Sequence, residues 1–173
     1  MARGDEQFVE FVRASSARLL HAAYLLTGNR HQAEDATQTA LARTYAAWSR
    51  VRNRDAYAYT RKVLANHVID GWRRPISEHA TDQPPELPVH GDLAGEVTRQ
   101  RWLSEALDRL SARERTIVVL RHFFDLPEAE VADELKVSLG TVKSTNSRAL
   151  AKLRISMDEP GDTPSTLNTG AER

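Results

Sequence analysis

The sequence predicts an all-α protein in which two small helical domains are joined by a flexible acidic linker. Apolar residues recur at steps of three and four over most of the chain, without the alternating pattern of a β-strand. Residues 75–95 interrupt this periodicity with four prolines and two glycines, as is typical of a connecting segment. We therefore expect domains at residues 1–75 and 97–155, a linker at 76–96 and a disordered tail at 156–173.

Composition excludes several classes of function. The chain of 173 residues has no cysteine, so disulfides, thiolate chemistry and cysteine-ligated zinc are ruled out. Its six histidines are scattered, and the sequence has no recognisable catalytic nucleophile, paired-carboxylate site or phosphate-binding glycine loop. We therefore expect no enzyme activity, no metal and no cofactor.

The sequence carries no signal for export or membrane insertion. No apolar run approaches the roughly 20 residues that span a bilayer. The first residues, MARGDEQFVEF, lack the apolar core of a signal peptide. We expect a cytoplasmic protein without membrane insertion.

The net charge of zero conceals blocks of opposite sign. Residues 1–74 carry a net charge of +5 and residues 99–154 carry +3, whereas residues 75–98 carry −5 and residues 155–173 carry −3. Such blocks suggest different partners for different parts of the chain. A chance distribution with a solubilising tail is the alternative.

The first two predicted helices are separated by a clear turn signal. The first helix spans residues 5–27 and ends where Gly28 can adopt a left-handed conformation. Asn29 can then cap a second helix at residues 31–50. The apolar stripe of that helix consists of Ala33, Thr37, Ala40, Leu41, Thr44 and Trp48. Its opposite face carries Asp35, Gln38, Ala42 and Ser49.

A third helix is predicted at residues 56–73, after the basic loop SRVRNR at 49–54. Asp55 can cap this helix, and Pro75 prevents its continuation. A narrow arc of its surface carries Tyr59, Lys62, Asn66, Asp70 and Arg73. Cations beside an aromatic ring and an amide suit single-stranded DNA, whose bases stack and whose phosphates need neutralising. The alternatives are an intrahelical pair between Asn66 and Asp70, and core positions for Tyr59 and Trp72.

The C-terminal domain is predicted to contain four helical segments. The first spans residues 96–109, and a capping box of Ser111 and Glu114 starts the second. A short helix at 127–135 begins at its proline. Ser138 can cap the last helix, at 139–154.

The last helix has an apolar arc and a basic polar face. The apolar arc consists of Val142, Ala149, Leu150 and Leu153. The polar face consists of Thr141, Lys143, Ser144, Ser147, Arg148 and Lys152. A short helix, a tight turn and a longer basic helix describe a helix-turn-helix, whose second helix enters the DNA major groove. The alternative is a surface helix whose cations favour its C-terminal end. Asn146 lies near the apolar arc, so we expect either partial exposure there or a hydrogen-bond partner for its amide.

Taken together, these segments resemble bacterial sigma factors of the sigma-70 family. The segment LSARERTIVVLRHFFDLPEAEVADELKVSLGTVKSTNSRALAKLR at 110–154 is similar to region 4, which reads the promoter −35 element. HQAEDATQTALARTYAAW at 31–48 is similar to region 2.2 with its Asp-x-x-Gln, here Asp35 and Gln38. YTRKVLANHVIDGWRRP at 59–75 is similar to regions 2.3 and 2.4. Two such domains without a third resemble the extracytoplasmic-function group, in particular its small actinobacterial SigE-like members.

The resemblance implies an RNA polymerase sigma factor that binds the core enzyme, recognises −35 and −10 promoter elements and promotes promoter melting. Contacts with the β′ clamp helices would come from Asp35, Gln38, Thr39, Ala42 and Arg43, with Trp48 near their edge. Contacts with the −10 strand, including a flipped base, would come from Arg50, Arg52, Arg54, Tyr59, Lys62, Asn66, Arg73 and Arg74. Contacts with the −35 duplex would come from Lys136, Thr141, Lys143, Ser144, Ser147, Arg148 and Lys152.

The resemblance also implies further partners, namely the polymerase β flap and an anti-sigma factor. It places the acidic linker in the polymerase active-site cleft and RNA exit channel, where its charge would mimic RNA; a soluble spacer is the alternative. Two other functions remain open on the residues alone. One is a helix-turn-helix regulator that binds an operator without joining polymerase, and the other is a protein that sequesters a regulator through residues 5–50.

Overall fold

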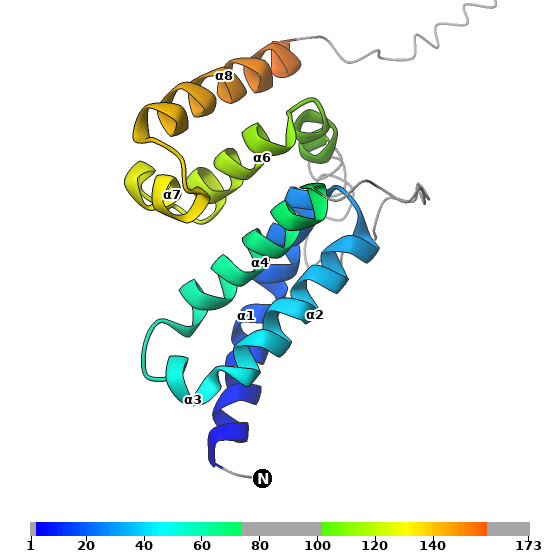
Figure 1. Ribbon diagram of the computed structural model, residues 1–173. Helices are drawn as coiled ribbons and strands as arrows, with labels where there is room; N and C mark the ends of the chain where they lie inside the picture. The colour runs from blue at the N-terminus through cyan, green and yellow to red at the C-terminus, as the bar shows by residue number, and fades with distance from the viewer. Residues whose placement is uncertain (1–2, 74–101, 159–173) are drawn as a thin grey trace, which may run out of the picture.

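The computed structural model describes residues 3–73 and 102–158, and all regular structure in these ranges is helical (Figure 1). This confirms the predicted all-α class. The predicted linker, most of the predicted tail and the first part of the helix expected at 96–109 lie outside the described residues.

The N-terminal half is a bundle of three long helices and one short one. α1 (Arg3–Thr27) is followed by α2 (Arg30–Ala46), α3 (Trp48–Val51) and α4 (Ala56–Arg73). Figure 1 shows α1, α2 and α4 side by side, and their contacts agree. Small and branched apolar side chains fill the space between them, among them Leu19, Ala22, Leu26, Ala33, Ala40 and Leu64. The small residues allow the helices to approach closely, so the polar faces of α2 and α4 are left for solvent.

Local capping signals in this half are confirmed. Gly28 adopts a φ of +65° after α1, which a residue with a Cβ rarely does. Asn29 Oδ1 accepts a hydrogen bond from the backbone N–H of Gln32 at 3.0 Å. Asp55 Oδ1 accepts one from the N–H of Ala58 at 2.9 Å.

The helix predicted at 31–50 is interrupted, so that part of the prediction is wrong. α2 ends at Ala46, and Ala47 has φ −98° and ψ 5° before α3 begins. The change of direction brings the Trp48 ring to 5.1 Å from that of Phe8 and 5.4 Å from that of Phe11, between ring centroids. Burying a large aromatic side chain contributes roughly 1.5–3 kcal/mol, which outweighs one irregular turn. Trp48 is 8% exposed, so its expected place at the edge of a polymerase-binding face is also wrong.

The C-terminal half contains a helix over residues 102–108, α6 (Ala112–Val118), the π-helix η1 (Val119–Phe123), α7 (Glu128–Leu135) and α8 (Leu139–Asp158). The predicted capping box is present: Ser111 Oγ accepts from the N–H of Glu114 at 3.3 Å, and Glu114 Oε2 accepts from the N–H of Ser111 at 2.9 Å. Pro127 precedes α7 as its N-cap. α8 extends four residues beyond its predicted end.

The π-helix was not predicted. In it the N–H of Phe124 donates to the carbonyl of Val119 at 3.1 Å, five residues back, instead of the usual four. The chain then turns through Asp125, whose φ is +56°, and the Arg121 guanidinium donates to the carbonyl of Leu126. The π-helix directs the neighbouring rings of Phe123 and Phe124 towards the N-terminal half.

The two halves pack against each other through one continuous cluster of buried residues. In Figure 1, α6 and α7 lie beside α4, while α8 lies on the far side of α6. Leu64 and Val68 of α4 belong to the same buried cluster as Ile117 and Leu120. The structure therefore shows the two helical units in direct contact.

Candidate nucleic-acid and polymerase interfaces

The C-terminal half presents the predicted helix-turn-helix. α7 ends at Leu135, and the left-handed backbone of its C-cap Lys136 (φ +56°, ψ +45°) turns the chain towards α8. Ser138 Oγ accepts a hydrogen bond from the N–H of Thr141 at 3.1 Å and so caps α8, as predicted. Val142 and Ala149 of α8 are fully buried against the rest of this half.

The predicted −35 residues lie together on the outer surface of this motif. Thr141 is half-buried, and the exposed members are Lys136, Lys143, Ser144, Ser147, Arg148 and Lys152. Short hydroxyl side chains between the cations let the helix backbone approach a groove closely, and the cations can reach phosphates or guanine. The residue types of this face are thus those expected of a helix that enters a groove of duplex DNA.

Two lysines of this face are held by acidic residues of the same half. Lys152 Nζ donates to both carboxylate oxygens of Glu114 at 2.9 Å. These hydrogen bonds, with those from Ser111, hold the pKa of Glu114 below its usual value despite the opposing effect of burial. Lys143 Nζ lies 4.0 Å from Glu128 Oε2 at a more exposed position. The contact with Glu114 was not predicted, because it joins residues 38 positions apart in the sequence.

Asn146 is buried and has a hydrogen-bond partner, which is the second of the two alternatives predicted from the sequence. It is 9% exposed, and its Oδ1 lies 3.1 Å from Nε2 of His122. The partner satisfies an amide that burial would otherwise penalise. Helix α8 is thereby fixed to the π-helix by a polar contact as well as an apolar one.

The predicted polymerase-binding residues share the solvent face of α2. Asp35, Gln38, Ala42 and Arg43 are exposed, and Thr39 is half-buried. Asp35 Oδ2 lies 3.3 Å from Nε2 of His67 on α4, yet the Asp35 side chain remains 75% exposed. His67 was not among the predicted residues, because only the packing of α2 on α4 brings it beside Asp35.

The predicted −10 residues divide between a loop and a helix. Arg50, Arg52 and Arg54 are exposed around α3, and Arg52 Nη1 donates to Gln7 Oε1 at 3.4 Å. Lys62 and Asn66 are exposed on α4. The backbone of Arg73 ends α4, whereas its side chain, that of Trp72 and the whole of Arg74 lie outside the described residues.

A small pocket gathers part of this set around the turn that the sequence did not predict. It has a volume of about 380 Å³ and is lined by Arg43, Ala46, Ala47, Ser49, Arg50 and Tyr59. Ala47, where the helix is interrupted, is itself part of the pocket wall, together with Tyr59 of α4. The Tyr59 ring also packs on the small cluster of Trp48, Val51 and Ala56, so it is partly a core residue, as the alternative interpretation held. Arg43 lies beside Arg50 here, although the sequence assigned the two to different partners.

Comparison with known proteins identifies the family. Residues 11–75 match sigma-70 region 2, and residues 100–153 match sigma-70 region 4. The chain is 41% identical over 150 residues to the RNA polymerase sigma-E factor of Streptomyces coelicolor, covering 86% of this chain and 84% of the relative. The chain belongs to the sigma-70 family of RNA polymerase sigma factors. The resemblance inferred from the sequence motifs is thereby confirmed.

Other relatives place this sigma factor in the extracytoplasmic-function group. It is 30% identical over 155 residues to the ECF RNA polymerase sigma factor SigL of Mycobacterium tuberculosis, covering 86% of this chain and 87% of the relative. Its fold is similar to that of the sigma factor RpoE of Bartonella quintana, solved with the anti-sigma factor NepR. That match has a TM-score of 0.66 and 22% identity, and covers 87% of this chain and 96% of the other.

Two other features of the described residues bear on function. None of the helices that the structure describes is long and apolar enough to cross a membrane. Within the same ranges, no group of three histidine or acidic side chains is placed to hold a metal ion.

Proposed function

We propose that this sigma factor divides promoter recognition between its two halves, with the α8 face on the −35 duplex and the α3–α4 surface on the melted −10 strand. One observation supports this most directly. The chain matches both sigma regions, and it has an exposed basic face on α8 as well as an exposed polar face on α2. A regulator that only binds an operator needs the basic face of α8 but not the polar face of α2.

In the −35 contact, Ser144, Ser147 and Arg148 face base edges, and Lys136, Thr141 and Lys143 contact the flanking phosphates. Arg148 is the strongest candidate for base discrimination, because a guanidinium can bind guanine O6 and N7 together. Lys152 would have to leave Glu114 to reach a phosphate. We therefore expect the smallest contribution from Lys152.

In the −10 contact, the 380 Å³ pocket beside α3 receives a base that has left the stack. Tyr59 provides an aromatic surface, Ser49 provides a hydroxyl, and Arg43 and Arg50 provide charge for the attached phosphates. Lys62 and Asn66 continue the strand contact along α4. Arg52, Arg54, Arg73 and Arg74 add further positive charge in this proposal.

The polymerase contact uses the α2 face, where Asp35, Gln38, Thr39 and Ala42 meet the β′ clamp helices. His67 holds Asp35 in position from α4. The β flap is the proposed partner of the C-terminal half, and an anti-sigma factor is proposed as a regulator. The protein acts in the cytoplasm, where polymerase and DNA are found, and it catalyses no reaction by itself.

Co-purification with polymerase core tests this proposal. Wild-type protein is expected to bind core and to support run-off transcription, and Asp35→Ala/Gln38→Ala is expected to weaken both. Asp133→Ala, which removes an exposed carboxylate from α7, serves as the matched control and should change neither. Absence of core binding by the wild type, together with dimeric binding to a palindromic duplex, would replace the proposal with an operator-binding regulator.

A further inference from the structure

The contact between the two halves is centred on a buried arginine. Arg61 of α4 is 6% exposed, and its Nη2 donates to Glu130 Oε1 at 3.0 Å and to Glu134 Oε1 at 2.5 Å. Both acids belong to α7, the first helix of the helix-turn-helix. The Arg61 guanidinium also lies 5.9 Å from the centre of the Phe124 ring. Arg61 is not among the residues proposed to bind DNA or polymerase, so its burial needs another explanation.

Contacts from α1 complete the interface. Arg18 Nη2 donates to the backbone carbonyl of Phe123 at 2.9 Å, and its guanidinium lies 5.4 Å from the centre of the Phe123 ring. The His21 ring lies 5.2 Å from the same ring, between centroids. The Phe123 ring is thus held by two residues of α1, and the π-helix places it there.

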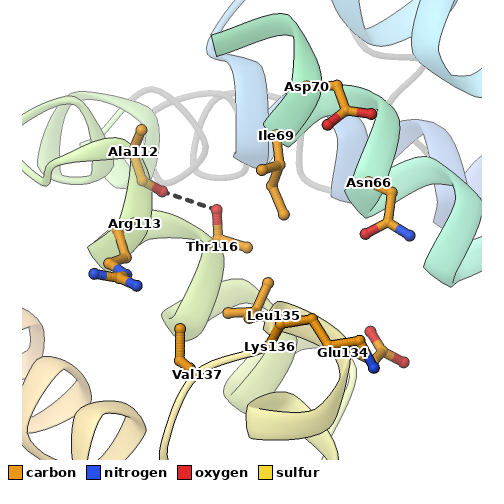
Figure 2. A pocket seen from close by; sticks show the side chains of 10 residues that line it. All are labelled: Asn66, Ile69, Asp70, Ala112, Arg113, Thr116, Glu134, Leu135, Lys136 and Val137. Atoms are coloured by element: carbon orange, nitrogen blue, oxygen red, sulfur yellow. Dashed lines mark hydrogen bonds between the residues drawn. The ribbon is translucent and has the colours of Figure 1, made fainter. Parts of the chain in front are cut away.

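The C-terminal half lies across a cleft from part of the surface proposed to bind the −10 strand. A cleft of about 470 Å³ separates α4 from α6 and α7, and Figure 2 shows the side chains that line it. Asn66 and Asp70 line the cleft from α4, while Arg113 and Lys136 line it from the C-terminal half. A DNA strand running along α4 past Asn66 would meet the C-terminal half in this arrangement.

With the two halves packed together, as in this structure, the protein is also too compact to contact both promoter elements at once. The −35 and −10 elements are about 25 base pairs apart, which is about 85 Å along the duplex at about 3.4 Å per pair. The helices proposed to read them share a single buried cluster here. The segment between Arg73 and Trp102 has 28 residues, and a chain of that length can reach about 95 Å when fully extended. Both elements are therefore within reach only after the halves separate.

We propose that Arg61, Glu130 and Glu134 form a latch that keeps the free sigma factor closed and must open before the promoter is bound. This inference rests on the proposed function of the α4 and α8 surfaces. Opening returns the buried charges of Arg61 and Glu134 to water, whereas the Glu130 side chain is already 45% exposed. Two polar atoms, Arg61 Nε and Glu134 Oε2, are buried without a hydrogen bond in the closed form. Water can satisfy both atoms in the open form, so the contact is suited to reversible release.

Energy transfer between two dyes on the full-length chain tests the latch. Since the sequence has no cysteine, Ala14→Cys on α1 and Ala129→Cys on α7, both exposed, give two defined labelling sites. Arg61→Glu places a third carboxylate against Glu130 and Glu134 and is expected to lower transfer in the free protein. Adding Glu130→Lys/Glu134→Lys to Arg61→Glu reverses the pair and is expected to restore transfer. Arg13→Glu, the same charge change at an exposed position of α1, should leave transfer unchanged.

Promoter binding gives the functional readout. Affinity for a binding-competent form is reduced by the fraction of molecules in that form. If the open form is a minor state of at most about 10%, Arg61→Glu should bind a forked promoter fragment about 10-fold or more tightly than wild type. The fragment carries the −35 duplex and a single-stranded −10 element from a promoter mapped by run-off transcription.

The outcomes separate the latch from the proposed function. If Arg61→Glu keeps native helix content by circular dichroism and transfers energy as wild type does, no latch exists. Equal loss of transfer in Arg61→Glu and Arg13→Glu, or high transfer in wild-type holoenzyme on the promoter, would also overturn it. Glu130→Gln/Glu134→Gln provides a milder opening variant if Arg61→Glu does not fold. Failure of wild-type run-off transcription instead overturns the proposed function, and the energy-transfer result on the free protein is unaffected.

Discussion

Glu114 performs two tasks that substitution can separate. Its Oε2 accepts the N–H of Ser111 in the capping box, and both of its oxygens accept from Lys152. Glu114→Gln keeps an amide oxygen for the capping bond and removes the charge that holds Lys152. Glu114→Ala removes both. The difference between the two variants therefore isolates the cap.

The magnitudes follow from exposure and bond type. A hydrogen bond to a charged group contributes about 1.5–3 kcal/mol, but the Lys152 side chain is 49% exposed, where solvent reduces ion pairs towards about 1 kcal/mol. One capping hydrogen bond contributes about 1 kcal/mol more. We expect Glu114→Gln to cost about 1 kcal/mol and Glu114→Ala about 2 kcal/mol. For a chain of this size these losses lower the thermal midpoint by about 2–4 °C and 4–8 °C.

The pH dependence of this difference has a defined sign. Because the folded-state pKa of Glu114 is lowered, its contribution is present above the unfolded pKa and is lost as pH falls through the folded value. The stability gap between wild type and Glu114→Gln should be full near pH 7 and should narrow below about pH 4.3, the ordinary glutamate pKa. Thermal unfolding followed by circular dichroism at several pH values measures it.

The same variant has a consequence for DNA binding. Glu114→Gln releases Lys152 towards the DNA, so the slope of log affinity against log salt should steepen by about 0.9, the value for one phosphate contact. Equal destabilisation by Glu114→Gln and Glu114→Ala would refute the assignment of two separate tasks. So would a difference in stability between wild type and Glu114→Gln that persists unchanged below about pH 4.3. An unchanged salt slope would refute the competition between Glu114 and DNA for Lys152.

Three further predictions concern single positions. Gly28→Ala should lower the free energy of unfolding in urea by about 1 kcal/mol or more, because φ is +65° and the new Cβ would lie 3.0 Å from Asp108 Oδ1. Arg148→Ala should weaken binding to the mapped −35 duplex by about 1–3 kcal/mol and relax discrimination at one base pair. Lys143→Ala, which removes a proposed phosphate contact, should instead reduce affinity equally for all sequences; equal behaviour of the two variants in a competition assay would contradict base readout. Arg50→Ala should reduce permanganate reactivity of the melted −10 region while core binding is retained, and an unchanged reactivity pattern would remove Arg50 from the −10 contact.

Local signals in the sequence predicted much of the fold, because they depend on neighbouring residues. Gly28, Asn29, Ser111 and Ser138 all begin or end helices as predicted, through bonds that span at most a few residues. The family was also predictable, because two independent motifs occur in the expected order. The exposed faces of α2 and α8 followed from helical periodicity, which requires only that each helix has one buried side.

Features that depend on contacts between distant residues were not predicted. The break at Ala47 follows from the packing of Trp48 on α1, and periodicity alone continues the helix through it. Nothing in the sequence singled out Arg61, since its acidic partners lie about 70 residues away. Asn146 was recognised as an anomaly, but its partner His122 became visible only when the helices were packed.

The π-helix η1 absorbs one extra residue within a single helical turn. A turn that closes over five residues holds one residue more than an α-helical turn while completing about the same rotation. Removing one residue from Val119–Phe123 would therefore change the direction of the following chain little. The bonds within the helix-turn-helix would be preserved, but one side chain fewer would be available where Phe123 and Phe124 meet α1 and α4. A relative without this residue would keep the means to read DNA and would have to join its halves through a different set of side chains.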